Sequence, residues 1–318
     1  MENNIDKYLT IVLITYNRAA DFFNTLQQFS NSPFVNCKIV VQNNCSTDNT
    51  IKVVQEFKNV FPHLNIITNK FNIGANANIM RAVENSDTEY TWIVADDDNY
   101  DFSDCNDIIT QIQKLKFNLI QVGGQNDRDW KWGKSENTPM ELESKDYPYF
   151  RYSSFIGSSI FRTEYFIKHI IEGYNNIINS YPHMPYLLNI YKENQKIYIS
   201  KKRMVIAANP HNASYTGSQM IVWWTETSKL LPTKKEQRFC FVEQYDFKHN
   251  YYKAMLLPLY MLIRGKIHFH QYINILFLFN IVQILKIFCY SIIGEGFFII
   301  QKFRNKRNFR RNLIDLSI

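Results

Sequence analysis

Three consecutive aspartates, Asp96, Asp97 and Asp98, follow the apolar segment 91–95. That segment is short, β-branched and aromatic, which predicts a buried strand. Carboxylates at the carboxyl end of such a strand face the crevice where open α/β sheets bind ligands. Adjacent negative charges repel one another unless a cation or hydrogen bonds compensate them. Because Mg²⁺ and Mn²⁺ prefer oxygen ligands, the triplet is a candidate metal site. The alternative is a solvated acidic loop that caps a helix beginning near Ser103.

The first 125 residues alternate predicted strands and helices. The expected strands are 8–14, 38–41, 64–68, 90–95 and 119–122, and the expected helices are 21–29, 50–57, 75–83 and 108–115. This order predicts the α/β class, with a mostly parallel sheet, helices on both faces and right-handed crossovers. Further along, a long functional loop is expected over 124–150, strands over 153–161 and 197–207, and a helix over 164–171.

The charge of the chain is uneven. Residues 251–318 hold 10 Lys/Arg and 2 Asp/Glu, a balance of +8, whereas the whole chain carries +7. A basic tail of this kind is typical of a contact with nucleic acid or with anionic lipid. The five cysteines are odd in number and form no CxxC pair, which favours a reducing cytosol over a disulfide framework or a zinc site. The apolar run 9–14 is too short for a signal peptide, so we expect a cytoplasmic protein.

The very apolar segment 273–300 is interrupted by polar residues, of which Asn280, Gln283 and Lys286 recur every three residues. This stripe favours an amphipathic helix lying in the plane of a membrane surface over a spanning helix. The basic residues that follow would then meet anionic headgroups. We therefore expect peripheral association with the inner face of the plasma membrane and no binding of nucleic acid. The alternatives are packing on the α/β domain and formation of a homo-oligomer.

Four segments now align in order. They are Thr10–Arg18 (TIVLITYNR), Val40–Thr50 (VVQNNCSTDNT), Asn72–Asn78 (NIGANAN) and Trp92–Asp98 (WIVADDD), and each ends or follows a predicted strand. Together they resemble the inverting glycosyltransferases of family 2, which have the GT-A fold, a Rossmann-like, mostly parallel sheet flanked by helices. The resemblance implies a catalytic domain over 1–235, with a nucleotide-sugar half (1–125) and an acceptor half (126–235). A helical, basic appendage follows over 236–318.

The resemblance also implies which residues bind the nucleoside diphosphate sugar. They are Thr15, Tyr16, Asn17, Arg18, Asn43, Asn44, Asn72, Gly74, Asn78, Asp96 and Asp97. Asn43 and Asn44 stand where the family commonly has acids, which leaves the base open, since an amide both donates and accepts. A turn that caps the next helix is the structural alternative for 43–48. Gly74 lets the backbone approach the ligand closely.

The Asp triplet matches the DxD motif of the family, which implies Mn²⁺ or Mg²⁺ as cofactor. We expect Asp98 to bind the metal directly and Asp96 to contact the ribose or a metal-bound water, while a shift by one residue keeps Asp97 a candidate. His211 is a further candidate ligand of the metal or the pyrophosphate; the alternative is a loop histidine without that role. The metal would act as a Lewis acid on the leaving pyrophosphate.

An inverting displacement needs a base for the acceptor hydroxyl, and the family places an acid at the start of a later helix. The matching place here holds His183, which titrates near neutrality; a structural histidine is the alternative, and Glu164 and Glu172 are weaker substitutes. Trp130 and Trp132 could form an acceptor platform or pack in the core.

The resemblance implies an enzyme that adds one sugar to a glycan or lipid-linked acceptor in surface polysaccharide synthesis. A sugar nucleotidyltransferase and a non-enzymatic, membrane-associated scaffold are the rival interpretations. The first would need a Gly-rich, basic loop where Thr15–Arg18 offers one arginine and no glycine. The second is opposed by the intact Asp triplet, although the missing carboxylate base keeps it open.

Overall fold

The structure is a computed structural model of the chain. It describes residues 5–103, 105–124, 140–145, 150–200, 203–206, 216–244 and 253–285. The chain is divided into two compact units, Met1–Ala208 and Asn209–Ile318. The boundary that we expected near residue 235 stays a prediction. None of the helices in the described ranges is both long and apolar enough to cross a membrane.

The first unit is built around an eight-stranded sheet in the order β3-β2-β1-β4-β9-β6-β10-β8. The strands are β1 (Leu9–Thr15), β2 (Lys38–Asn43), β3 (Leu64–Thr68), β4 (Tyr90–Ala95), β6 (Leu119–Gln121), β8 (Met140–Glu143), β9 (Ser159–Arg162) and β10 (Lys196–Ile199). The first four are parallel to one another, as are β6 and β10, while β9 runs antiparallel to both of its neighbours and β8 runs antiparallel to β10. The predicted α/β class with a mostly parallel sheet is confirmed.

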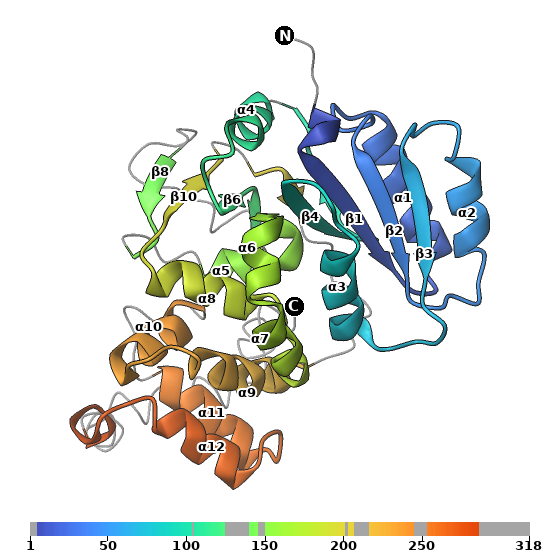
Figure 1. Ribbon diagram of the computed structural model, residues 1–318. Helices are drawn as coiled ribbons and strands as arrows, with labels where there is room; N and C mark the ends of the chain where they lie inside the picture. The colour runs from blue at the N-terminus through green and yellow to red at the C-terminus, as the bar shows by residue number, and fades with distance from the viewer. Residues whose placement is uncertain are drawn as a thin grey trace. The chain divides into compact units, whose positions relative to one another are not determined.

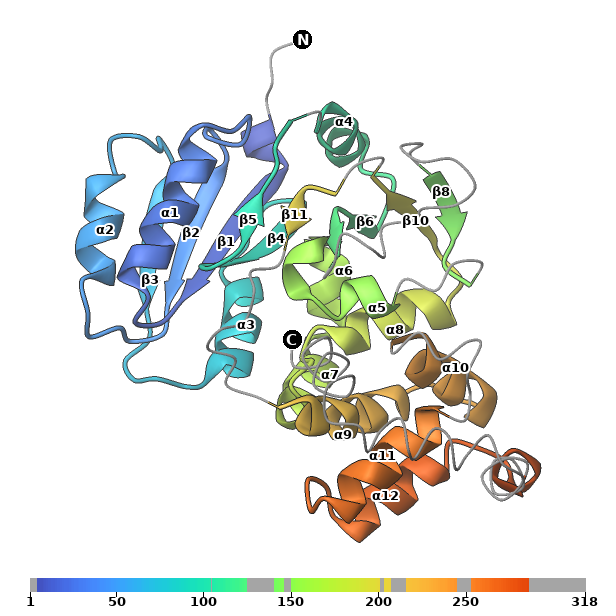
Figure 2. The ribbon, with the colours of Figure 1, turned by 180° about the vertical axis from the view of Figure 1, so that it is seen from behind.

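Helices cover both faces of this sheet (Figures 1 and 2). They are α1 (Ala19–Ser30), α2 (Thr50–Glu56), α3 (Ala75–Glu84), α4 (Asn106–Lys114), α5 (Phe150–Ser153), α6 (Thr163–Lys168), α7 (Ile170–Asn175) and α8 (Met184–Lys192). The strand order explains the two layers. From β1 to β3 the chain moves outward, so right-handed crossovers put α1 and α2 on one face. From β3 it returns past β1 to β4, which puts α3 on the other face.

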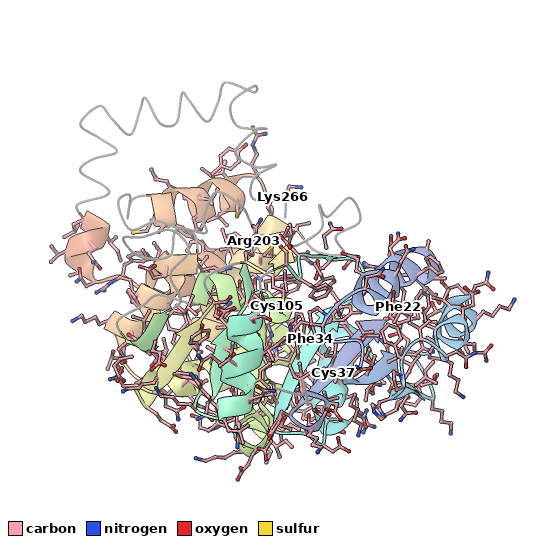
Figure 3. The ribbon with its side chains drawn as sticks, turned by 90° about the horizontal axis from the view of Figure 1, so that it is seen from above. Phe22, Phe34, Cys37, Cys105, Arg203 and Lys266 are labelled. Carbon is pink, nitrogen blue, oxygen red and sulfur yellow. The ribbon has the colours of Figure 1, made fainter. Side chains whose placement is uncertain are left out.

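The core under α1 and α2 is apolar because alternate residues of each strand point to the same face. Leu9, Ile11 and Leu13 of β1 pack there with Phe22 of α1 and with Cys37, all fully buried (Figure 3). A second, three-stranded sheet is formed by β5 (Asn99–Tyr100), β11 (Val205–Ile206) and β7 (Gly123–Gly124). The segment expected as a strand over 153–161 is a strand only at its end, since the last residue of α5, a turn and the 3₁₀ turn η3 (Ile156–Ser158) precede the short β9. Two further 3₁₀ turns are η1 (Ile5–Lys7) and η4 (Ile177–Asn179).

The described part of the second unit is helical. It contains α9 (Gly217–Ser228), α10 (Lys234–Gln244), α11 (Lys253–Ile263) and α12 (Phe269–Leu276). The prediction of a single helix over 273–300 is wrong, because α12 ends at Leu276 and a new helix begins after Asn280. Asn280 and Gln283 cap that helix reciprocally: the Gln283 amide donates to Asn280 Oδ1 at 2.9 Å, and the Asn280 amide to Gln283 Oε1 at 3.0 Å. Two of the three polar residues of the expected stripe therefore form a helix cap.

Candidate active site

The Asp triplet lies directly after β4, at the carboxyl edge of the parallel strands. The neighbouring strand β1 ends at Thr15, in register with Asn43 at the end of β2. The topology thus brings the polar residues after β1, β2 and β4 to one edge, as the sequence predicts. Asp96 and Asp98 are almost fully buried, whereas Asp97 is partly exposed.

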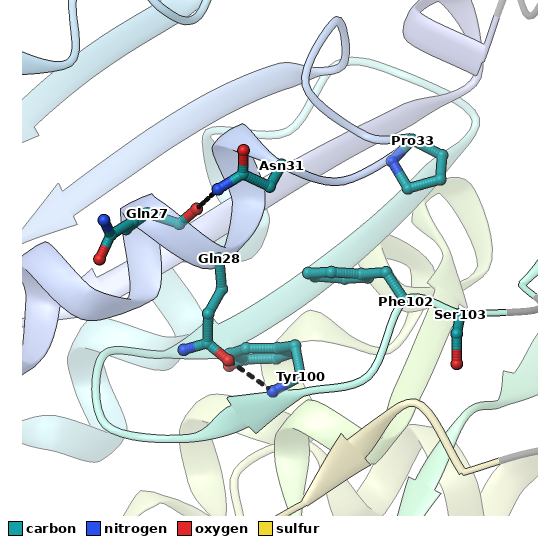
Figure 4. Close-up of a pocket in the computed structure, with 7 residues that line it drawn as sticks. All are labelled: Gln27, Gln28, Asn31, Pro33, Tyr100, Phe102 and Ser103. Carbon is teal, nitrogen blue, oxygen red and sulfur yellow. Dashed lines mark hydrogen bonds between the residues drawn. The ribbon is translucent and has the colours of Figure 1, made fainter.

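Helix α1 holds the backbone of the triplet. Thr25 Oγ1 donates a hydrogen bond to the carbonyl oxygen of Asp96 at 3.0 Å, and Gln28 Nε2 donates to that of Asp98 at 3.4 Å. Gln28 Oε1 also accepts the amide of Tyr100 at 2.8 Å, in a surface groove of about 540 Å³ between α1 and the chain after β5 (Figure 4). The carboxylates therefore project from a backbone that neighbouring side chains fix.

Arg18 compensates part of the negative charge. Its Nη1 forms an ion pair with Asp96 Oδ1 at 3.1 Å and a second ion pair with Asp97. Burial raises the pKa of Asp96 to about 6, although the charge of Arg18 acts in the opposite direction. The ionised form of this carboxylate is thus left incompletely stabilised.

The chemistry of these side chains fits a divalent cation. Asp96 and Asp97 share the single guanidinium of Arg18, and carboxylate oxygens are the ligands that Mg²⁺ and Mn²⁺ prefer. Within the described ranges no group of three His, Cys, Asp or Glu side chains is arranged to enclose a metal ion. A cation at this edge would therefore take further ligands from water and from substrate phosphates, as Mg²⁺ usually does.

The loop after β1 is fixed against the loop after β2. Asn17 has a left-handed backbone (φ 52°), and its Oδ1 accepts the amide of Thr47 at 2.7 Å. Asp48 Oδ2 accepts the amide of Ala19, the first residue of α1, at 2.9 Å. Thr15, the last residue of β1, is buried, whereas Tyr16 after it is 42% exposed.

Four asparagines join the second and third loops through their side-chain amides. Asn44 Nδ2 donates to Asn72 Oδ1 at 2.8 Å. Asn69 Nδ2 donates to Asn44 Oδ1 at 2.9 Å and to Asn78 Oδ1 at 2.8 Å. Asn44 and Asn78 are buried within this network. The network positions the loops, and base pairing by Asn44 would require an exchange of these partners.

Asn43 forms the turn that the sequence offered as the alternative for this segment. It is fully buried, its Oδ1 accepts the amide of Ser46 at 3.0 Å, and Cys45 between them has a left-handed backbone (φ 65°). Gly74 precedes α3 with φ 83°, a conformation that favours glycine, and its amide donates to Asn72 Oδ1 at 2.8 Å. The predicted close approach of the Gly74 backbone to a ligand stays a prediction.

His183 is the N-cap residue of α8, so its predicted position at a helix start agrees with the structure. Its ring is 2% exposed, and Nε2 donates to the carbonyl oxygen of Ser153 at 2.9 Å. Burial lowers the pKa of His183 to about 4, against the opposing effect of the backbone hydrogen bonds. The imidazole is therefore neutral at pH 7 and is enclosed by protein.

The remaining candidates are apart from the triplet or outside the described residues. Glu164 is exposed on α6, and Glu172 on α7 accepts Asn189 Nδ2 at 2.8 Å. His211, Trp130 and Trp132 lie outside the described residues.

The sequence profile of "Glycosyl transferase family 2" matches residues 10–186, more than half of the chain. The chain belongs to glycosyl transferase family 2. No curated protein sequence matches it. Among solved structures, S. aureus TarS 1–349 in complex with UDP-GlcNAc is 16% identical with a TM-score of 0.60, covering 85% of this chain and 79% of that one. Mannosyltransferase PcManGT from Pyrobaculum calidifontis, in complex with GDP-Man and Mn²⁺, is 12% identical with a TM-score of 0.50, covering 85% of each chain. At these identities the likeness concerns the fold.

This family 2 member is a nucleotide-sugar glycosyltransferase with a GT-A-like fold. The assignment favours the enzyme over both rival interpretations. The sequence analysis missed Thr25 and Gln28, the side chains that hold the Asp triplet. Thr25 carried a signal, since it lies beside the apolar positions Phe22, Leu26 and Phe29 of an amphipathic helix, where a buried hydroxyl needs a partner.

Proposed function

We propose that this glycosyltransferase adds one sugar from a nucleoside diphosphate sugar to a glycan or lipid-linked acceptor, with inversion and with Mn²⁺ or Mg²⁺ at the Asp triplet. The observation that carries the proposal is the pairing of Arg18 with Asp96 and Asp97 of the triplet at the carboxyl edge of β4 and β1. That edge is where open α/β sheets bind nucleotides. The named complexes of the similar structures, with UDP-GlcNAc and with GDP-Man and Mn²⁺, support the donor class and the metal.

In this proposal the loop residues Thr15–Arg18 and the amide-bearing loops after β2 and β3 line the donor site. Asp98 would bind the cation, with Asp96 and Asp97 beside it. When bound, the cation supplies Lewis-acid stabilisation to the leaving diphosphate. The protein itself contributes a fixed carboxylate array, because Thr25 and Gln28 hold its backbone. His211 remains a proposed further ligand.

We propose His183 as the base that takes the proton of the acceptor hydroxyl. Its lowered pKa supports one requirement, since a base must be unprotonated at the working pH. The burial of His183 also restricts which ring nitrogen can accept the proton. Because Nε2 already donates to Ser153, the proton must reach Nδ1, after local opening or through a water molecule. His183→Ala should lose orders of magnitude in transfer while nucleotide affinity stays constant; survival of transfer within a few-fold would place the base elsewhere.

We propose that the second unit associates peripherally with the inner face of the plasma membrane, where a lipid-linked precursor of a surface polysaccharide would be presented. The support is the +8 balance of residues 251–318 together with large exposed apolar side chains, among them Ile263, Phe277 and Ile281. Apolar side chains beside basic residues are typical of interfacial binding.

A donor screen tests the proposed function. The purified chain would be incubated with UDP-, CDP-, GDP- and dTDP-sugars in Mn²⁺, in Mg²⁺ and in EDTA, and nucleotide release would be measured. We expect release from one nucleotide class only, present with a divalent cation and absent in EDTA and in Asp98→Ala. Release that is equal in EDTA would exclude the metal-dependent mechanism. Hydrolysis with none of the donors, followed by transfer with none of a panel of lipid-linked glycans, would exclude the donor assignment.

A further inference from the structure

Arg18 is shared between two carboxylates of the triplet through a single nitrogen. Nη1 lies 3.1 Å from Asp96 Oδ1 and also pairs with Asp97. Asp96 is almost fully buried, whereas the Arg18 side chain is 40% exposed. The partly exposed guanidinium therefore occupies carboxylate oxygens that a cation at the triplet would need as ligands.

The backbone of Arg18 is fixed, while its head group is not enclosed. Its carbonyl oxygen accepts the amide of Phe22 in the first turn of α1 at 2.8 Å. The residues on either side, Asn17 and Ala19, are tied to Thr47 and Asp48 of the next loop. A long side chain on a fixed base can change partners by rotamer rotation alone, a motion on the picosecond to nanosecond scale for exposed residues.

Electrostatics determine whether Arg18 pairs with the carboxylates or with the diphosphate, without and with a bound cation. Without a cation, the guanidinium is the counter-ion of Asp96 and Asp97. When a divalent cation binds the carboxylates, Arg18 and the cation repel each other, and the Arg18–carboxylate pairs lose their advantage. A planar guanidinium also matches phosphate oxygens in bidentate geometry, so the diphosphate of the donor is its natural second partner.

We propose that Arg18 competes with the divalent cation for Asp96 and Asp97, and transfers to the diphosphate when donor and cation bind. The inference rests on the proposed function, since it assumes a cation at the triplet. It assigns Arg18 two roles: it pairs with the empty carboxylates, and it binds and neutralises the diphosphate in the loaded site. Metal binding and donor binding are thereby coupled through one side chain.

The first test measures Mn²⁺ alone on the nucleotide-free protein, by electron paramagnetic resonance titration of free Mn²⁺. Arg18→Gln should tighten Mn²⁺ binding by about three- to tenfold, because it removes a competing cation from a partly exposed pair. The matched control is Arg81→Gln, which removes an exposed arginine paired with Glu84 at 2.9 Å on α3 and should leave Mn²⁺ affinity unchanged. Unchanged or weaker Mn²⁺ binding in Arg18→Gln would overturn the inference.

The second test measures UDP and GDP by calorimetry at saturating Mn²⁺. For whichever nucleotide binds, Arg18→Gln should weaken binding at least about tenfold, and Arg18→Lys, which keeps the charge without the fork, should fall between. Equal nucleotide affinity in all three proteins would overturn the transfer to the diphosphate.

The variant Asp98→Ala separates the failure of this inference from the failure of the proposed function. If it leaves Mn²⁺ binding intact, the proposed metal site itself fails, whatever Arg18 does. Thermal melts with and without Mn²⁺ check that each variant folds, and Arg18→Met, which also removes the charge, replaces Arg18→Gln if the latter does not fold.

Discussion

Asn76 and Ile177 are 101 residues apart in the sequence, yet Asn76 Nδ2 donates a hydrogen bond to the carbonyl oxygen of Ile177 at 2.9 Å. The same nitrogen lies 3.2 Å from Ser180 Oγ. Asn76 belongs to the first turn of α3, two residues after Gly74, and the segment that contains Ile177 and Ser180 leads into His183. One amide thus joins the proposed donor side to the segment that carries the proposed base.

Asn76→Ala should therefore impair transfer more than donor binding. Loss of the amide frees the segment before His183, and small misplacements of a reacting group can cost about 10²-fold in rate. We expect transfer to fall at least about tenfold in kcat, with nucleotide affinity within twofold and stability lowered by about 1 kcal/mol. Steady-state transfer kinetics and calorimetry measure both quantities. Asn59→Ala, at an exposed asparagine, is the control. A variant that loses nucleotide affinity and transfer in parallel would place Asn76 on the donor side only.

Gly173 should tolerate no side chain. A Cβ built there lies 2.5 Å from Met80 Cε and 2.8 Å from the carbonyl oxygen of Pro182, the residue before His183. The methionine can move but the backbone oxygen cannot, so Gly173→Ala should destabilise the protein by about 1–3 kcal/mol. Gly157→Ala is the matched control, since its nearest neighbour would be Phe155 at 3.4 Å. Urea unfolding measures both, and equal midpoints for the two variants would contradict the packing argument.

The sequence predicted local elements of the structure, but not the contacts between distant segments. β3 (Leu64–Thr68) and β4 (Tyr90–Ala95) have the predicted bounds, because each is a short, β-branched run that is flanked by turn-forming residues. β4 is almost fully buried inside the sheet, whereas β3 lies at its edge and is partly exposed. The segment 153–161 has a similar composition, but a short apolar run does not distinguish a strand from helical turns. The pairing of Arg18 with Asp96 and Asp97 depends on β1 lying beside β4, and the burial of His183 depends on where Ser153 lies. Neither relation is local, so neither was predicted.

Removal of one carboxylate tests the metal site directly. Asp98→Ala should lower transfer by about 10²-fold or more and weaken nucleotide binding in Mn²⁺, because the charge of the diphosphate loses its bridge to the protein. In EDTA, wild type and variant should bind nucleotide equally weakly. Glu56→Ala, at an exposed carboxylate on α2, is the control for a general change in charge. Full activity of Asp98→Ala would refute the metal assignment.

The buried imidazole of His183 predicts a pH dependence of stability. Its pKa is lowered from 6.5 to about 4 in the folded protein, so the unfolded chain binds more protons between these values. The associated stability is present above pH 6.5 and is lost as pH falls toward 4. At pH 5 the loss amounts to roughly 2 kcal/mol. The difference in unfolding free energy between wild type and His183→Gln should narrow by that amount from pH 7.5 to pH 5. A constant difference would mean that His183 is solvated in the folded state.

The exposed apolar side chains of the second unit predict membrane binding that depends on both their character and the nearby basic charge. Phe277 and Ile281 are each 65% exposed, and the chain from residue 251 onward carries the +8 balance. Wild type should float with vesicles that contain anionic lipid, and high salt should weaken the binding because it screens the headgroup attraction. Phe277→Ser with Ile281→Ser should reduce flotation severalfold at every salt concentration, since it removes apolar surface that would insert into the membrane.

The control is Ile178→Ser, which removes an apolar side chain 80% exposed on the first unit and should float like wild type. Loss of flotation in the control as well would indicate nonspecific adhesion, and equal binding to neutral and anionic vesicles would refute the electrostatic contribution.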